Sequence, residues 1–163
     1  MDMDKKLQKA INEQIKNELY SSYMYLAMAF YFDSINLGGF GRWMKAQARE
    51  ENGHAMKLYE HMDDRGVKTT LEAIDKPPAT FASPVQVFQE TLKHEKKVTK
   101  MIENIYQIAE EKKDNAAKIM LQWFITEQVE EEKTASDILE TLKMVADKPQ
   151  ALIMLDRELG RRE

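Results

Sequence analysis

The chain contains no cysteine among its 163 residues, and it is poor in proline and glycine, with four and six residues. The absence of cysteine excludes a disulfide framework, thiol catalysis, cysteine-ligated iron or zinc, and a rubredoxin-type module. No apolar run reaches the roughly 18 residues that a membrane span needs, and the N-terminus is acidic and polar. We therefore expect neither export nor membrane insertion, and we expect a cytoplasmic location.

An excess of charge of one sign is also missing. Charged residues make up 32% of the chain, both signs are interspersed, and the formal net charge is -4. Because phosphate binding needs concentrated positive charge, nucleic acid is not the expected partner. A chain of 163 residues can bury a sizeable hydrophobic core without disulfide or metal staples. We predict a single domain over residues 1–163.

Apolar residues recur at alternating steps of three and four residues in four long segments, which is typical of amphipathic helices in a bundle. No segment shows the period of a strand, so the predicted fold class is all-α. The four bundle helices lie within about residues 4–147, and a short fifth helix occupies about residues 149–160. The predicted helices span about 4–35, 40–65, 84–109, 117–145 and 149–160, and residues 110–115 form the turn before the fourth.

Glycine and proline mark the ends of these helices. Gly38 and Gly39 are expected to take the positive φ angles that end the first helix, and Gly66 ends the second. Ser83 and Pro84 form an N-cap and first-turn signal. The segment between Gly66 and Ser83 has no helical pattern, but extended it reaches roughly 55–60 Å. That length exceeds a 28-residue helix of about 42 Å, so we predict one long crossover along the bundle.

Each of the four apolar stripes is interrupted by polar residues about 11 to 16 residues into its helix. At about 1.5 Å per residue, these positions agree within roughly one turn, so the polar groups can share one layer at mid-bundle. A glutamate and a histidine three residues apart in the second helix lie on the same helix face. The interrupting residues are Glu18 in the first helix, Glu51 and His54 in the second, Glu95 in the third, and Gln128 and Glu131 in the fourth.

Taken singly, these residues have ordinary explanations. Glu18 or Glu95 alone fits an edge residue or a polar group that sets helix register, and His54 alone fits a hydrogen-bonded core histidine. Four carboxylates in one dry layer, however, would repel one another and would each cost several kcal/mol to bury. Two divalent cations compensate that charge, and oxygen ligands with one imidazole suit iron or manganese. The shared level across four helices therefore favours a two-metal site.

Three further acidic residues lie one position off the stripes. Glu50, Glu127 and Glu130 fit either a third metal position beside the first two or an exposed acidic patch.

Several other side chains near this layer have two interpretations. Tyr25, one heptad after Glu18, and Trp123 fit electron donors or, more simply, core packing. His94 is expected to face solvent. Gly53 destabilises the second helix by roughly 1 kcal/mol. Its presence there has two explanations: a close contact with another segment, or a substitution without functional consequence.

The chain resembles the non-haem ferritins of bacteria and archaea over essentially its full length. The likeness rests on four groups of residues taken together, and it implies a ferritin-like bundle. The groups are Asn17 to Tyr23 around Glu18, Glu50-Glu51-Asn52-Gly53-His54-Ala55, His94-Glu95, and Glu127-Gln128-Val129-Glu130-Glu131-Glu132.

The resemblance implies a ferroxidase centre and the roles of its residues. Glu18, Glu51 and His54 would surround one iron, and Glu51, Glu95 and Glu131 the second, with Gln128 close by. Tyr25 matches a tyrosine beside the centre, and a third iron position matches Glu50, Glu127, Glu130 and Glu131. The family forms hollow shells of 24 subunits, in which iron(II) is oxidised by O2 or H2O2 and stored as ferric mineral.

Two departures from the related bacterioferritins bear on cofactors. The fourth helix lacks the Glu-x-x-His pair, since Glu130 and Thr134 stand at that spacing after Glu127 and Glu131. Asn52 occupies the position of their haem-binding methionine, so no haem is expected. Two alternatives to a ferroxidase remain open at this point: a rubrerythrin-like peroxide reductase and a purely structural helical bundle.

Overall fold

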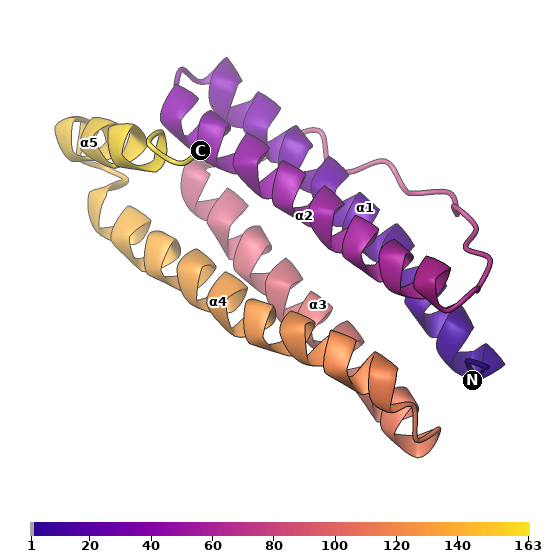
Figure 1. The fold of residues 1–163 in the computed structure, drawn as a ribbon. Helices are drawn as coiled ribbons and strands as arrows, with labels where there is room; N and C mark the ends of the chain where they lie inside the picture. Colours follow the sequence, from indigo (N-terminus) through magenta and orange to yellow (C-terminus); the bar gives the residue numbers. More distant parts are fainter. Residues whose placement is uncertain (1) are drawn as a thin grey trace.

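The computed structural model describes residues 2–163, which form five helices and no strand (Figure 1). This confirms the predicted all-α, ferritin-like bundle with a short fifth helix. The helices are α1 (Lys5–Ser34), α2 (Gly38–Asp64), α3 (Pro84–Glu111), α4 (Asn115–Val145) and α5 (Pro149–Leu159). None of these helices within residues 2–163 is both long and apolar enough to cross a membrane.

The bundle consists of two antiparallel helix pairs. A short turn joins α1 to α2 and another joins α3 to α4, and the two pairs meet chiefly where α1 packs against α3. Residues 65–83 run back along the first pair, so that α3 starts near the end of the bundle where α2 began (Figure 1). As a result, α2 and α3 point in the same direction. The long crossover predicted from the sequence is therefore present.

Side chains cap the helices of the second pair. Ser83 accepts a hydrogen bond from the backbone N–H of Gln86 at 3.1 Å, and Pro84 follows in the first turn, as predicted. Asp114 accepts from the backbone N–H of Ala117 at 3.0 Å and caps α4. Arg65 donates to both carboxylate oxygens of Asp114 at 3.0 Å. This paired contact fastens the end of α2 to the start of α4.

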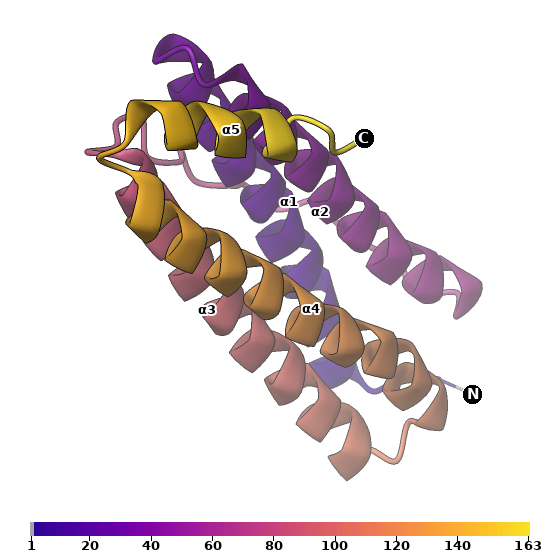
Figure 2. The same cartoon turned by 90° about the vertical axis from the view of Figure 1, so that its left-hand side faces the viewer.

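The expectation for Gly38 and Gly39 was wrong. The residue with positive φ in this turn is Asn36, at 62°, and both glycines lie inside α2. A methyl group on Gly39 would lie 1.7 Å from the carbonyl oxygen of Asp156 in α5. Gly39 therefore allows the close approach of α5, which lies across one end of the bundle (Figure 2). Gly66, with φ of 68°, does end the second helix as predicted.

The apolar core has two parts, one towards each end of the bundle. The part beneath α5 contains stacked aromatic rings, with Phe32 and Phe40 at 4.8 Å between centroids. The other part is mostly aliphatic and includes Ile11, Leu58 and Ile102. Between them lies a layer of buried polar side chains, at the level that the sequence indicated.

Candidate metal centre

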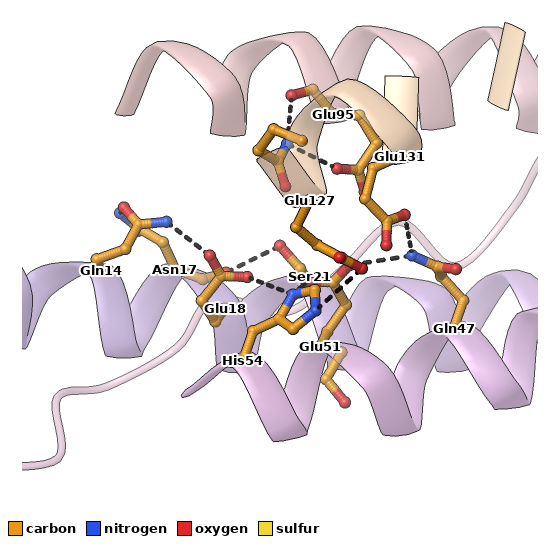
Figure 3. A network of polar contacts seen from close by, with 12 residues as sticks. Gln14, Asn17, Glu18, Ser21, Gln47, Glu51, His54, Glu95, Glu127 and Glu131 are labelled. Atoms are coloured by element: carbon orange, nitrogen blue, oxygen red, sulfur yellow. Dashed lines mark hydrogen bonds and ion pairs between the residues drawn. The ribbon is translucent and has the colours of Figure 1, made fainter. Parts of the chain in front are cut away.

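The polar layer brings together side chains from all four bundle helices, and Figure 3 shows most of them. All six stripe-interrupting residues are buried, with exposed fractions between 1% and 9%. They lie on helices at inward positions because the apolar residues one turn before and after them pack in the core. These residues are Glu18, Glu51, His54, Glu95, Gln128 and Glu131.

One cluster is formed by α1 and α2. Glu18, Glu51 and His54 each offer one ligand atom within 4.8 Å of the others. His54 Nδ1 lies 3.2 Å from Glu51 Oε2 and 3.8 Å from Glu18 Oε2. Glu18 Oε2 is buried and accepts no hydrogen bond from residues 2–163. A buried carboxylate oxygen without a donor is costly in a metal-free core, and a cation would satisfy it.

A second cluster joins the two helix pairs. Glu51, Glu95 and Glu131 also offer atoms within 4.8 Å of one another, so Glu51 belongs to both clusters. Tyr25 donates its hydroxyl hydrogen to Glu95 Oε1, and Gln128 Nε2 donates to Glu95 Oε2 at 3.1 Å. Both carboxylate oxygens of Glu95 are thereby oriented. The shared Glu51 places the two clusters side by side, as a bridging ligand between two cations would.

Two glutamines that the sequence analysis did not single out support these carboxylates. Gln14 Nε2 donates to Glu18 Oε1 at 2.9 Å. Gln47 Nε2 donates to Glu51 Oε1 at 3.1 Å and to Glu131 Oε2 at 2.7 Å, which links α2 to α4. In both α1 and α2, the amide lies four residues before the carboxylate. That repeated spacing is the signal from which the pair could have been found.

This layer contains more carboxyl groups than cationic groups, so burial and mutual repulsion favour the protonated forms of Glu51 and Glu131. Burial raises the pKa of Glu51 well above its ordinary value, and it raises the pKa of Glu131 to about 8. Burial alone would lower the pKa of His54, but its contacts with Glu18 and Glu51 outweigh that effect and raise it to about 11. Without metal, protons therefore carry the compensating charge. A cation that enters must displace them.

A third cluster lies beside the first two, and it contains two of the four residues predicted for a third metal position. His54 Nε2 is 3.9 Å from Glu127 Oε1, and these two residues with Glu131 offer atoms within 4.8 Å of one another. Glu130 is exposed, and Glu50 forms an ion pair with Arg162 at 2.9 Å. The structure thus brings Glu127 and Glu131 together with His54, while Glu50 and Glu130 stay outside the cluster.

The two aromatic residues near the layer differ in environment. Tyr25 is fully buried, and burial together with the charge of Glu95 raises its pKa well above the usual value. Trp123 is 40% exposed, its ring lies 5.4 Å from that of His54, and Lys57 Nζ lies 4.4 Å over it. Tyr25 therefore contacts the layer directly, while Trp123 covers His54 at the surface.

The expectation that His94 faces solvent was wrong. Its Nε2 lies 2.7 Å from Ser21 Oγ, and its ring meets the ring of Tyr25 edge-on. Ser21 Oγ also lies 3.0 Å from the carbonyl oxygen of Asn17, so the hydroxyl bridges His94 and the backbone of α1. Burial lowers the pKa of His94 to about 4, so the ring is neutral. The crossover passes over this side of α3, and its residues 73–75 form one wall of the pocket that His94 lines.

A surface groove of about 520 Å³ leads to the layer between α2 and α4. Its lining includes His54, Glu127, Trp123 and Gly53. A methyl group on Gly53 would meet nothing within 4 Å, which excludes a close contact as the reason for this glycine. The groove gives solvent access to His54 Nε2 and the carboxylate of Glu127.

Comparisons with known proteins agree with this architecture. Residues 8–145 match the family described as "Ferritin-like domain". The chain is 39% identical over 160 residues to a bacterial non-heme ferritin of Bacteroides fragilis, covering 98% of this chain and 99% of that protein. A bacterial non-heme ferritin of Staphylococcus aureus is 35% identical, with 98% and 96% covered. A crystal structure of an open pore ferritin from the archaeon Archaeoglobus fulgidus superposes with a TM-score of 0.98 at 43% identity, covering 99% of this chain and 100% of that one.

Proposed function

Because the chain belongs to the ferritin family, and within it to the non-haem ferritins of bacteria and archaea, we propose that it oxidises iron(II) and stores the ferric product. The observation that carries this proposal is the pair of clusters that share Glu51. Two iron(II) ions held there can each give up one electron. Together, with two protons taken up in either case, they reduce O2 to H2O2 or H2O2 to two water molecules, and the iron(III) formed passes to the mineral.

Each buried residue has a role in this proposal. Glu18, Glu51 and His54 hold the first iron, and Glu51, Glu95 and Glu131 hold the second. Oxygen ligands with a single imidazole suit iron in both oxidation states and give no preference to a thiolate-seeking metal. Gln128 and Tyr25 keep Glu95 oriented through their hydrogen bonds. Holding both ions in register is the main contribution of the chain, because it makes a two-electron step available.

A third iron position continues from these two towards the groove. Glu127 and Glu131 form a cluster with His54, and Glu50 lines the same surface groove as Glu127. Together with the exposed Glu130, three residues after Glu127, they form an acidic path from His54 to the surface. We assign this path to the transfer of iron between the two-metal centre and the stored mineral. His54 faces both the centre through Nδ1 and Glu127 through Nε2.

We further propose that the chain assembles into a hollow homo-oligomeric shell of 24 subunits in the cytoplasm. Large apolar side chains lie exposed on three parts of its surface: Phe30 on α1, Leu71 in the crossover and Met154 on α5, with 62%, 76% and 71% exposed. Contacts between subunits would remove these side chains from water. No haem is included, because Asn52 stands where a methionine ligand would be needed.

The function is tested by mixing anaerobic iron(II) with the metal-free protein and then with O2, and following the absorbance of iron(III). The double substitution Glu51→Ala, His54→Ala is expected to slow the initial rate about a hundredfold or more, because even the outer partners of metal ligands contribute about 10- to 100-fold. Glu90→Ala, on an exposed face of α3, is the control. An unchanged rate in the double variant would refute the assignment. Peroxide consumption that depends on an added reductant, without mineral, would indicate a peroxide reductase instead.

A further inference from the structure

The C-terminal segment after α5 folds back onto α2 and places a cation at the edge of the metal centre. Arg162 Nη2 lies 2.9 Å from Glu50 Oε1. The guanidinium lies 4.5 Å over the ring of Trp43, and Nη1 donates to the carbonyl oxygen of Trp43 at 3.4 Å. The side chain of Arg162 is only 22% exposed. These contacts fix one orientation of the guanidinium, so the ion pair is a defined part of the fold.

Glu50 is close enough to the acidic path to share its electric field. Glu50 lines the same surface groove as His54 and Glu127, so its carboxylate faces the space through which the acidic path reaches the surface. The position of Glu50 directly before Glu51 explains this placement. A cation that neutralises Glu50 therefore changes the potential along the path from the surface groove to His54.

The neighbouring arginine provides an internal comparison. Arg161 of the same segment pairs with Glu158 in the last turn of α5 at 3.0 Å, and both side chains are more than 60% exposed. Such an exposed pair contributes little to stability and does not fix the position of neighbouring side chains. Arg162, in contrast, is stacked, hydrogen-bonded and paired with a carboxylate beside the metal centre.

We propose that Arg162 is a tethered counter-cation that withholds Glu50 from the third metal position and so limits each chain to two tightly bound ions. This inference rests on the proposed function, because it concerns the regulation of the same centre. When the C-terminal segment is docked, the guanidinium of Arg162 compensates the charge of Glu50 in place of a metal ion. When the segment leaves, Glu50 joins Glu127 and Glu131 as a ligand. Docking of the segment and binding of a third ion therefore oppose each other, and each weakens the other by the same factor.

The test counts bound metal ions. Metal-free protein is titrated anaerobically with cobalt(II), and binding is followed by its visible absorption and by calorimetry. Wild-type protein is expected to bind two ions per chain tightly. Arg162→Met keeps an apolar stem over Trp43 but removes the charge, and it is expected to bind a third ion about tenfold more tightly than wild type does, within the usual range of coupling between sites. Arg161→Met is the matched control and should behave as wild type.

Three further measurements make the result decisive. Adding Glu50→Gln to Arg162→Met should abolish the gain, because the ligand that Arg162 releases is then missing. Arg162→Lys, which retains the charge, should bind two ions. In wild-type protein, hydrogen exchange of residues 159–163 should rise only when cobalt exceeds two equivalents, a readout that needs no variant.

Equal stoichiometry and affinity in Arg162→Met and wild type, or unchanged exchange of the C-terminal segment, would overturn the role of Arg162 alone. Failure of the wild-type protein to bind two ions would overturn the proposed function, and this inference with it.

Discussion

Replacing Glu131 by glutamine should stabilise the metal-free protein while weakening its metal binding. Burial raises the pKa of this carboxyl from 4.5 to about 8. At pH 7 the unfolded chain has lost the proton that the folded chain retains, so folding takes up a proton. For a raised carboxyl pKa, stability is full below about pH 4.5 and falls by about 1.4 kcal/mol per pH unit up to about pH 8. The cost of this one carboxyl at pH 7 is therefore about 3 kcal/mol.

Glu131→Gln removes this cost and keeps the local geometry. The amide has nearly the same volume, and its oxygen can still accept the hydrogen bond that Gln47 donates at 2.7 Å. The free energy of unfolding should therefore exceed that of wild type by about 3 kcal/mol at pH 7, and the two proteins should agree within about 1 kcal/mol near pH 5.

The assay is guanidinium unfolding of chelator-treated protein at pH 5, 6, 7 and 8. Glu90→Gln, an exposed position, is the control and should follow wild type at every pH. Added cobalt(II) should reverse the order, because a ligand that binds the folded state stabilises it in proportion to its affinity. A stability difference that does not widen between pH 5 and pH 8 would refute the reasoning.

Metal binding at pH 7 should release at least one proton per chain, because His54, with its pKa raised to about 11, gives up a proton to become a ligand. The release is measured with a pH indicator in weak buffer. His54→Gln should lower it by about one proton per chain. Gly39→Ala should destabilise the docking of α5 by several kcal/mol, since its methyl group would lie 1.7 Å from the Asp156 carbonyl oxygen. Gly53→Ala, in open space within a helix, should instead stabilise by about 1 kcal/mol in thermal unfolding. Ser83→Ala should lower the melting temperature through loss of a cap that is typically about 1 kcal/mol.

The sequence predicted the inward-facing residues well, because helical spacing determines which side chains share a face. Glu18, Glu51, His54, Glu95 and Glu131 are all buried in one layer. This agreement depends only on helix periodicity and on the equal depth of the residues in their helices. Long helices without internal proline leave few alternative registers. The roles of these residues in metal binding remain predictions.

Features that depend on contacts between distant segments could not be predicted in the same way. His94 is only partly exposed because the crossover passes over that side of α3, and no local pattern gives the path of an irregular segment. The role of Gly39 is to leave room for α5, a contact across more than a hundred residues. The pairing of Glu50 with Arg162 has the same origin. Periodicity gives the face of a helix, but the partner on that face comes from the tertiary fold.

The crossover, residues 65–83, is the segment of chain that connects the α1–α2 pair to the α3–α4 pair. The α1–α2 pair carries Glu18, Glu51 and His54, and the α3–α4 pair carries Glu95 and Glu131. Neither pair holds all the residues of the proposed centre, so metal bound there would cross-link the two pairs. In a chain outside the shell, the exposed stretch of residues 70–76 is a natural place for a protease to cut. Before such a cut, the crossover supplies one fragment to the other at an effective concentration of about millimolar. After such a cut, only side-chain packing and bound metal would hold the two fragments together. The amount of bound iron would then determine whether a cut subunit stays folded.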